Sequence, residues 1–477
     1  MNTKRLSIIL MILGALWFSS SFAQESETLR LDLNSAIEIA LSENPSIKVA
    51  DMEIKKKQYG KKSAYGMLFP QIDLIGQYQH TIKRQTMYLD GAFGMGGDDM
   101  DLSGFEPEDL RVLEVLNKVM GPDPDADPNA GIQVGRKNLW SGGVNVSLPL
   151  VVPSLWKNIQ MTKTDLELGV EQARSSKINL TNQVKKAFYS ILLAQDSYNV
   201  FRETYETDSI NLQNIKDKHN QGLVAEYDVI TADVRLKGII PNILQAENML
   251  KIAELQLKML MGVDADLDIE IAGSLMDYEE TMFETIVPAD ENLSSNSDLR
   301  QFDLQTKMAK QAIGIQKAQM MPVLSSTFNY MYMNQSNDFR FKDYRWDPYS
   351  VVGINLAIPI FNGGQRRNAV QQSKIQLMQL QEQRFDVERG LKLSVKNNIE
   401  LINKNIEQVK ATESAVELAR KGYEITQKRY DTGMGTIVDL NSAALAVTST
   451  ELQYRNAIYD YLSAKADLEK ILGYDIN

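Results

Sequence analysis

The sequence predicts a mainly helical protein that also carries membrane-type β-strands and is built from two copies of one unit. Three observations predict this fold class: segments that return at a constant spacing, four short stretches in which polar and apolar residues alternate, and two very long stretches typical of single helices. Helices far longer than average seldom share a small domain with short strands. The mixture therefore restricts the possible architectures.

The internal repeat is the first of these features. Three positions return 211 residues later with the same residue type: Gly222, Asp228 and Gly262 return as Gly433, Asp439 and Gly473. A constant offset over such a distance indicates two copies of one supersecondary unit. We predict a first repeat over residues 24–273, a linker over residues 274–293 and a second repeat over residues 294–477.

The composition excludes several classes of function. The 477 residues include no cysteine and two histidines, so disulfides and thiolate metal sites are absent and a histidine-rich metal centre is not expected. The formal net charge of −11 offers no basic surface for nucleic acid. The mean hydropathy of −0.28 argues against a helical membrane protein. We find no nucleophile–base pair and no phosphate-binding loop, so we expect neither an enzyme nor a cofactor.

The N-terminus has the pattern of a secretory signal peptide. Lys4 and Arg5 precede a short apolar core over residues 6–18, and small residues end at Ala23. We therefore predict a signal peptide over residues 1–23 and a mature chain that begins at Gln24 and leaves the cytoplasm.

Four segments alternate with a period of two, as expected of strands with one apolar face. They cover residues 71–79, 140–148, 324–332 and 352–358. Tilted strands of about nine to eleven residues cross a bilayer. Aromatic residues such as Trp140 and Tyr330 fall near the strand ends, where membrane barrels carry aromatic girdles. A soluble antiparallel sheet covered by helices is the alternative.

Four strands cannot close a barrel in a membrane. The smallest membrane barrels have about eight strands, and an open edge in lipid leaves backbone groups unpaired. Several copies of the chain must then share one barrel, and this pattern does not choose between two copies and three. The connection over residues 85–138 is long and acidic, and we expect it at the outer end, facing the exterior.

Two very long helices are predicted over residues 154–219 and 364–431. The first contains no proline, and at roughly 1.5 Å per residue it would span about 100 Å. Apolar residues along it step by four and three: Leu180, Val184, Ala187, Ile191, Ala194, Tyr198, Phe201 and Tyr205. Such a heptad seam requires partner helices. An ordinary coiled coil is the alternative.

Each long helix is predicted to end at a tight turn and to be followed by a returning helix. Gly222 and Gly433 suit the left-handed conformation at a helix C-terminus. The returning helices are expected to end at Met261 and Leu472, and Pro241 is expected to kink or split the first. Two further helices are expected over residues 34–67 and 298–320.

Several motifs together resemble the TolC family of outer-membrane efflux proteins, over residues 29–473. They are the segment from Leu31 to Pro45, the Phe69-Pro70 and Met321-Pro322 junctions, the segment from Leu356 to Gly364, and Tyr430-x-x-Gly433-x-x-Thr436-x-x-Asp439-Leu440-x-x-Ala443. The resemblance implies a homotrimer whose twelve strands form one outer-membrane barrel. It also implies a helical cylinder across the periplasm, whose tip docks on a periplasmic adaptor joined to an inner-membrane pump. Such a protein is a passive duct for efflux or type I secretion.

The resemblance also implies functional residues at the periplasmic end. Asp439 matches a constriction aspartate, and Asp228 and Tyr430 match residues that link neighbouring helix pairs. Ser442 and Gly435 stand where the family carries a second aspartate and an arginine, so a double acidic ring is in doubt and that ionic link is missing. The turns that would dock the adaptor contain Gly222, Leu223, Gly433, Met434, Gly435 and Thr436.

Elementary electrostatics supports a constriction. Three copies of one carboxylate around an axis repel each other, so their pKa values should couple and rise, and the ring should attract cations. Helix N-terminal capping is the alternative for Asp228 and Asp439, and both roles can hold.

A periplasmic coiled-coil adaptor or a structural scaffold without a pore is the alternative function. An adaptor would show one helical hairpin flanked by soluble β-domains. Two hairpins with four membrane-length strands favour the duct.

Overall fold

The computed structural model describes residues 29–87, 106–108, 111–112, 114–115, 132–279, 282 and 293–474. Within them the chain divides into two compact units. The helical unit draws on the described residues within 1–61, 160–313 and 370–477, and the sheet unit on those within 62–159 and 314–369. Each unit thus combines parts of both predicted repeats. The predicted signal peptide lies outside the described residues.

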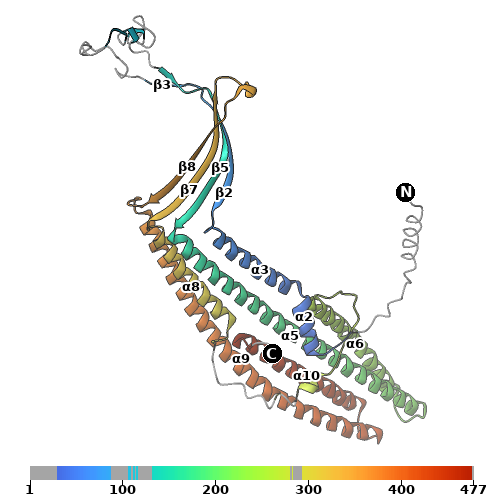
Figure 1. Cartoon of the computed structure of the whole chain (residues 1–477). Helices are drawn as coiled ribbons and strands as arrows, with labels where there is room; N and C mark the ends of the chain where they lie inside the picture. The colour runs from blue at the N-terminus through green and yellow to red at the C-terminus, as the bar shows by residue number, and fades with distance from the viewer. Residues whose placement is uncertain are drawn as a thin grey trace, which may run out of the picture. The chain divides into compact units, whose positions relative to one another are not determined.

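The sheet unit contains the four predicted strands, side by side in Figure 1. They are β2 (Gln71–His80), β5 (Asn138–Val151), β7 (Val323–Ser336) and β8 (Asp347–Ala357). They pair antiparallel in the order β2-β5-β7-β8. All except β2 extend the predicted segments by several residues at one end or both.

The register gives this sheet one apolar and one polar face. Leu74 lies opposite Val144, which lies opposite Tyr330. The neighbouring row on the other face aligns Asp73 with Asn145 and Asn145 with Asn329, and the Asn145 amide donates to the Asn329 side chain at 2.5 Å. Because side chains alternate along each strand, this register places most of the apolar residues of the four strands on one face.

The predicted loop over residues 85–138 begins and ends in a short ladder. In it β3 (Gln85–Met87) pairs antiparallel with β4 (Ile132–Val134). Most of the residues between these strands lie outside the described part of the chain. The shorter connection between β7 and β8 contains one turn of 3₁₀ helix, η2 (Phe341–Asp343).

The long helices confirm the sequence prediction. They are α5 (Pro153–Asn220) and α9 (Gln365–Asp431). The returning helices α6 (Glu226–Met261) and α10 (Ile437–Leu472) end at the predicted residues. Pro241 lies inside α6 and does not split it. No helix among the described residues combines the length and the apolarity that crossing a membrane requires.

The helix expected over residues 34–67 is two helices, and the prediction of one was wrong. They are α2 (Leu33–Glu43) and α3 (Pro45–Gly66), separated by Asn44. A residue that precedes proline avoids the helical conformation, and Asn44 has ψ 126°. Its side-chain amide instead donates to the Leu260 carbonyl at the end of α6, at 2.7 Å. The helix predicted over residues 298–320 is α8 (Ser297–Ala318).

Part of the predicted linker packs on the helices. Just before the linker, strand β6 (Ile269–Ile271) pairs in parallel with β1 (Leu29–Leu31). The linker itself starts with the 3₁₀ helix η1 (Leu275–Tyr278). The buried carboxylate of Asp196 in α5 accepts hydrogen bonds from Ser274 Oγ at 3.0 Å and from the Leu275 amide at 3.2 Å. These bonds hold the start of the linker against α5.

The helical unit has two apolar cores. The large core contains the first half of the predicted seam of α5, including Val184 and Ile191, and apolar residues of its counterpart in α9, including Val395 and Ile402. The tip core is a separate cluster near the two tight turns: Leu212, Ile215, Ala232, Tyr430, Ile437 and Leu440.

Candidate functional site

The two tight turns have the same backbone geometry. Gly222 and Gly433 adopt left-handed φ values of 74° and 77°. The residue after each glycine donates its amide five residues back, from Leu223 to Lys218 at 2.9 Å and from Met434 to Arg429 at 2.8 Å. This is the Schellman pattern that ends a helix with glycine in the left-handed region. The sequence prediction of glycine C-caps is confirmed.

Asp439 forms a capping box at the start of α10. Its carboxylate accepts from the Thr436 hydroxyl at 2.8 Å and from the Thr436 amide at 3.2 Å, and its own amide donates to Thr436 Oγ1 at 3.1 Å. These bonds, with a smaller contribution from the Arg429 charge, lower the pKa of Asp439. The capping alternative therefore holds within one chain. The predicted rise in pKa concerns three copies of this carboxylate and stays a prediction.

Asp228 occupies the equivalent position of α6, but its surroundings differ. The N-cap of α6 is Ala225, which offers no side-chain oxygen, so the first turn lacks the capping box of α10. Asp228 is half-buried, and its charge acts on Tyr430. The structure therefore brings Asp228 and Tyr430 together within one chain.

Tyr430 lies in the tip core with its side chain buried. Burial first, and then the charges of Asp228 and Asp431, raise its pKa to about 12, so the phenol stays protonated at neutral pH. Its hydroxyl has no hydrogen-bond partner among the described residues. Lys218 Nζ lies 5.1 Å from the centre of its ring, within cation–π range.

Two contacts join the hairpin of α5 and α6 to the hairpin of α9 and α10, and the sequence analysis did not predict them. Lys218 of α5 forms an ion pair with Asp431 of α9 at 2.9 Å. Asn211 donates to the Tyr423 hydroxyl at 2.9 Å. Each link joins residues more than two hundred positions apart. The sequence signal that could have found them is the repeat itself, which puts equivalent helices side by side.

The remaining tip residues form an exposed surface. Leu223 and Met434 follow the two turn glycines, and each side chain is 69% exposed. Thr436 is also exposed. Gly435 packs closely on the end of α9, because a Cβ there would lie 3.1 Å from the Tyr430 nitrogen. The charge of Arg429 acts on Asp439 and helps to lower its pKa.

We expect Tyr430→Phe to leave the stability of the chain nearly unchanged. A buried hydroxyl without a partner contributes little, so the change in unfolding free energy should stay within about 1 kcal/mol. Tyr430→Ala removes the ring from the tip core and should cost about 3–5 kcal/mol. Thermal melting in detergent, followed by circular dichroism, compares the two variants. A large loss for Tyr430→Phe would show that another copy of the chain bonds the hydroxyl.

Comparison with known proteins places this architecture in a family. The family model described as "Outer membrane efflux protein" matches residues 36–263 and 289–474. The outer membrane protein TolC of Vibrio cholerae is 25% identical over 365 residues, which cover 73% of this chain and 82% of that protein. The alkaline protease secretion protein AprF of Pseudomonas aeruginosa is 23% identical over 315 residues, 64% of each protein.

A solved structure shows the same fold. The outer membrane protein VceC from Vibrio cholerae superposes with a TM-score of 0.69 at 14% sequence identity, over 92% of this chain and 96% of that one. The resemblance to the TolC family found in the sequence is confirmed. Since the family model matches most of its length, this chain belongs to the outer membrane efflux protein family, a family of transport channels, and it is an outer-membrane protein.

Proposed function

We propose that this chain is the exit channel of a tripartite efflux system or a type I secretion system. Three copies close a twelve-stranded barrel in the outer membrane, and their helices line a duct across the periplasm. The duct is passive, and an inner-membrane pump joined through a periplasmic adaptor supplies the energy. This proposal rests on one observation. The four-stranded sheet has an apolar and a polar face, and each of its two edge strands, β2 and β8, pairs with a neighbouring strand on one side only within the described residues.

The apolar face of the sheet fits lipid. Leu74 is 85% exposed and Val352 is 73% exposed, and both lie on that face by register. Apolar residues this exposed in β2 and β8 are unfavourable in water. The ten residues of β2 extend about 34 Å, or about 25 Å vertically at the usual tilt, which matches the apolar band of a membrane barrel.

Aromatic side chains lie near both ends of the strands. Tyr78 stacks on Trp140 at 4.2 Å between ring centres, near the far end of the strands. Phe69, Trp156 and Phe361 are exposed near the end where the strands join the helices. Amphipathic rings prefer the two membrane–water interfaces. Two aromatic belts therefore support a sheet that crosses the outer membrane.

The open edges support an assembly of several copies. Within the described residues, β2 pairs with β5 alone and β8 with β7 alone. Unpaired edge groups are costly in lipid, so β2 of one copy would pair with β8 of the next. Their antiparallel directions suit this closure, since strand direction alternates across the sheet. Family resemblance favours three copies over two.

The exposed turns are the proposed docking surface for the adaptor. Leu223 and Met434 occupy equivalent positions of the two repeats, and both present apolar side chains at the tip. Exposed apolar side chains at a fixed spacing are suitable anchors for a partner protein. Gly222, Gly433, Gly435 and Thr436 shape the turns that present them.

We propose that Asp439 contributes its charge to the periplasmic constriction, together with the link between Asp228 and Tyr430. Asp439→Asn removes the charge but keeps an oxygen acceptor for the capping box. In planar bilayers this variant should raise the trivalent-cation concentration for half-block at least about tenfold, because each lost carboxylate contact is worth about 1 kcal/mol in water.

Thr436→Ala is the matched control for Asp439→Asn. It removes the hydroxyl of the capping box but leaves the charge in place. Cation block should therefore stay close to that of the native protein. If block is weakened by Thr436→Ala but not by Asp439→Asn, Asp439 acts through the helix cap and the constriction role is wrong.

The channel proposal as a whole is tested by assembly and conductance. The purified mature protein should run as a heat-resistant trimer in detergent and should produce ion-conducting steps after insertion into planar bilayers. A stable monomer that ignores detergent micelles would contradict the channel and favour the scaffold alternative.

A further inference from the structure

The interface between the two helical hairpins changes from apolar to polar and back again. On α5, Asp208 lies between the last residue of the large core and Leu212 of the tip core. On α10, Glu451 lies between the two cores in the same way. We call the intervening residues the ion-pair layer, defined by Asp208, Arg235, Arg420 and Glu451.

Two ion pairs form this layer: Asp208 with Arg235, which is largely buried, and Glu451 with Arg420, whose arginine side chain is exposed. Arg235 Nε lies 2.9 Å from both oxygens of Asp208, and its Nη1 donates to the Asn441 carbonyl of α10 at 2.5 Å. Arg420 of α9 donates twice to Glu451 Oε1, at 2.6 and 2.9 Å. Asp208 is 5% exposed and Glu451 is 6% exposed, whereas the side chains of their partners Arg235 and Arg420 are 17% and 60% exposed.

Each pair joins the two helices of one hairpin, α5 with α6 or α9 with α10, so neither pair holds the two hairpins together. Burial dominates the raised pKa of Asp208, which means that desolvation outweighs the attraction of Arg235. Buried ion pairs often contribute less stability than apolar packing of the same volume. The layer therefore holds the hairpins less firmly than either core does.

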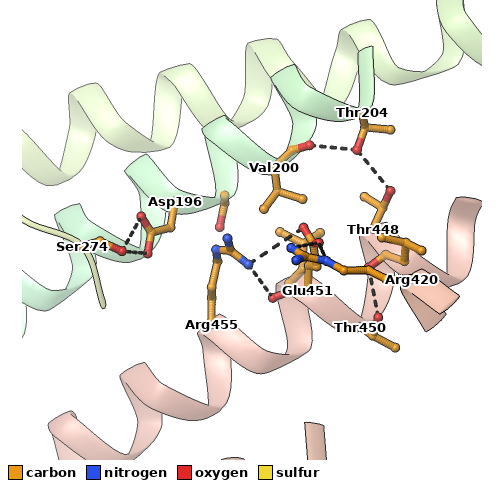
Figure 2. Close-up of polar contacts among 12 residues, drawn as sticks. Asp196, Val200, Thr204, Ser274, Arg420, Thr448, Thr450, Glu451 and Arg455 are labelled. Atoms are coloured by element: carbon orange, nitrogen blue, oxygen red, sulfur yellow. Dashed lines mark hydrogen bonds and ion pairs between the residues drawn. The ribbon is translucent and has the colours of Figure 1, made fainter. Parts of the chain in front are cut away.

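A cavity of about 240 Å³ lies within the layer. Its lining draws on all four helices and is largely polar, including Thr204, Thr207, Asp208, Arg235, Thr448 and Glu451. Thr204 and Thr448 face each other across the interface, with hydroxyl oxygens 3.1 Å apart (Figure 2). A polar cavity of this size accepts water. Separation of the helices here can therefore be compensated by hydration.

All four helices carry residues that weaken or bend a helix at this level. In α6, Pro241 removes one backbone hydrogen bond, three residues after Gly238. Gly422 lies in α9, two residues after Arg420. Thr204 donates back to the Val200 carbonyl at 2.8 Å and Thr448 to the Ala444 carbonyl at 3.2 Å. Such back-bonding often bends helices.

We propose that the ion-pair layer is a joint at which the tip of the helical unit moves. The moving tip segment comprises residues 209–236 and 424–443, and the large core stays packed when the layer opens. Opening costs little apolar contact, because the layer contains little, and it returns buried charges to water. This inference concerns the packing of the helices and does not depend on whether the chain conducts.

Hydrogen exchange on the full protein in detergent tests the joint. Amides of the tip segment should exchange together, at least about tenfold faster than amides of the large core around Ile191 and Ile458. Exchange of both regions at one common rate would overturn the proposal, even if the protein conducts ions. If the protein does not conduct ions but the tip segment and the large core still exchange at different rates, only the channel proposal is contradicted.

A disulfide across the layer provides the decisive variant. The chain has no cysteine, so Thr204→Cys with Thr448→Cys introduces the only possible pair. When oxidised, this variant should slow exchange of the tip segment about tenfold, and reduction should restore the native rate. The reduced form shows whether the variant folds. Formation of the disulfide without slower exchange in the tip segment would contradict the joint.

An apolar layer should have the same effect without a covalent bond. Arg235→Met with Asp208→Leu replaces the largely buried ion pair by packing, and we expect about tenfold slower exchange of the tip segment. The matched control is Lys251→Met with Glu247→Leu, which removes an exposed pair of α6 with a 2.7 Å contact. The control should leave tip exchange unchanged. An equal effect of both pairs would overturn the role assigned to the layer.

Discussion

Gly143→Ala is expected to abolish assembly of the proposed heat-resistant oligomer. Gly143 lies in the middle of β5, opposite Met331 of β7. A Cβ at this position would overlap the Tyr330 carbonyl oxygen and would lie 2.6 Å from the Met331 Cα. Both are backbone atoms of the paired strand, so no side-chain rotation relieves the overlap.

The strands β5 and β7 must therefore separate locally in this variant. Each backbone hydrogen bond lost in lipid costs several kcal/mol, and we expect the heat-resistant fraction to fall below about a tenth of the native value. Detergent gels of heated and unheated outer-membrane extracts measure this fraction.

Gly76→Ala is the matched control for this prediction. It adds the same methyl group to the neighbouring strand β2, where nothing lies within 4 Å of the new Cβ. The oligomer should assemble normally. If both variants assemble, or both fail, the close approach of β5 and β7 is not what requires glycine at position 143.

Gly473→Ala is expected to destabilise the helical unit strongly. Gly473 ends α10 at φ 71°, and an added Cβ would overlap the Ser295 carbonyl and lie 3.2 Å from the Asn296 Cα. Arg174 donates to the Gly473 carbonyl at 2.8 Å, so the turn is held in place and cannot shift to relieve the overlap. Strain of about 1–3 kcal/mol and the overlap together should cost about 4 kcal/mol or more.

Gly433→Ala separates the two causes of this loss. Gly433 has nearly the same φ, 77°, but nothing lies within 4 Å of its added Cβ. Only the backbone strain of about 1–3 kcal/mol should remain. The melting temperature in detergent should thus be highest for the native protein, lower for Gly433→Ala and lowest for Gly473→Ala. Equal melting of the two variants would show that the contact with Ser295 is unimportant.

Features with a local cause were predictable from the sequence. The C-terminal glycines of the helices follow from the lack of a side chain, and α6 and α10 end at the predicted residues. The seam in α5 was visible because heptad spacing reports burial, and Val184 and Ile191 are fully buried. The strands were visible because alternation reports a two-faced sheet.

Some local signals were nevertheless missed. The break between α2 and α3 follows from Pro45, but the helical pattern on both sides concealed it. The ladder between β3 and β4 joins strands of three residues each, which are too short to show a period. The candidate site was partly predictable: the repeat located Asp228 and Asp439 near the turns and the family resemblance located Tyr430, but neither predicted the ion pair of Lys218.

By itself, the sequence determined the two-copy plan, the membrane-type strands, the long helices with their turns, and the family. These depend on periodicity and on residue types a few positions apart. Only the tertiary structure decided which charges meet: Asp208 with Arg235 beside the Asn441 carbonyl, and Arg420 with Glu451. The physical reason is that a buried ion pair is set by the rotation and stagger of packed helices. A shift of one residue in that packing changes every partner without changing the pattern along the chain.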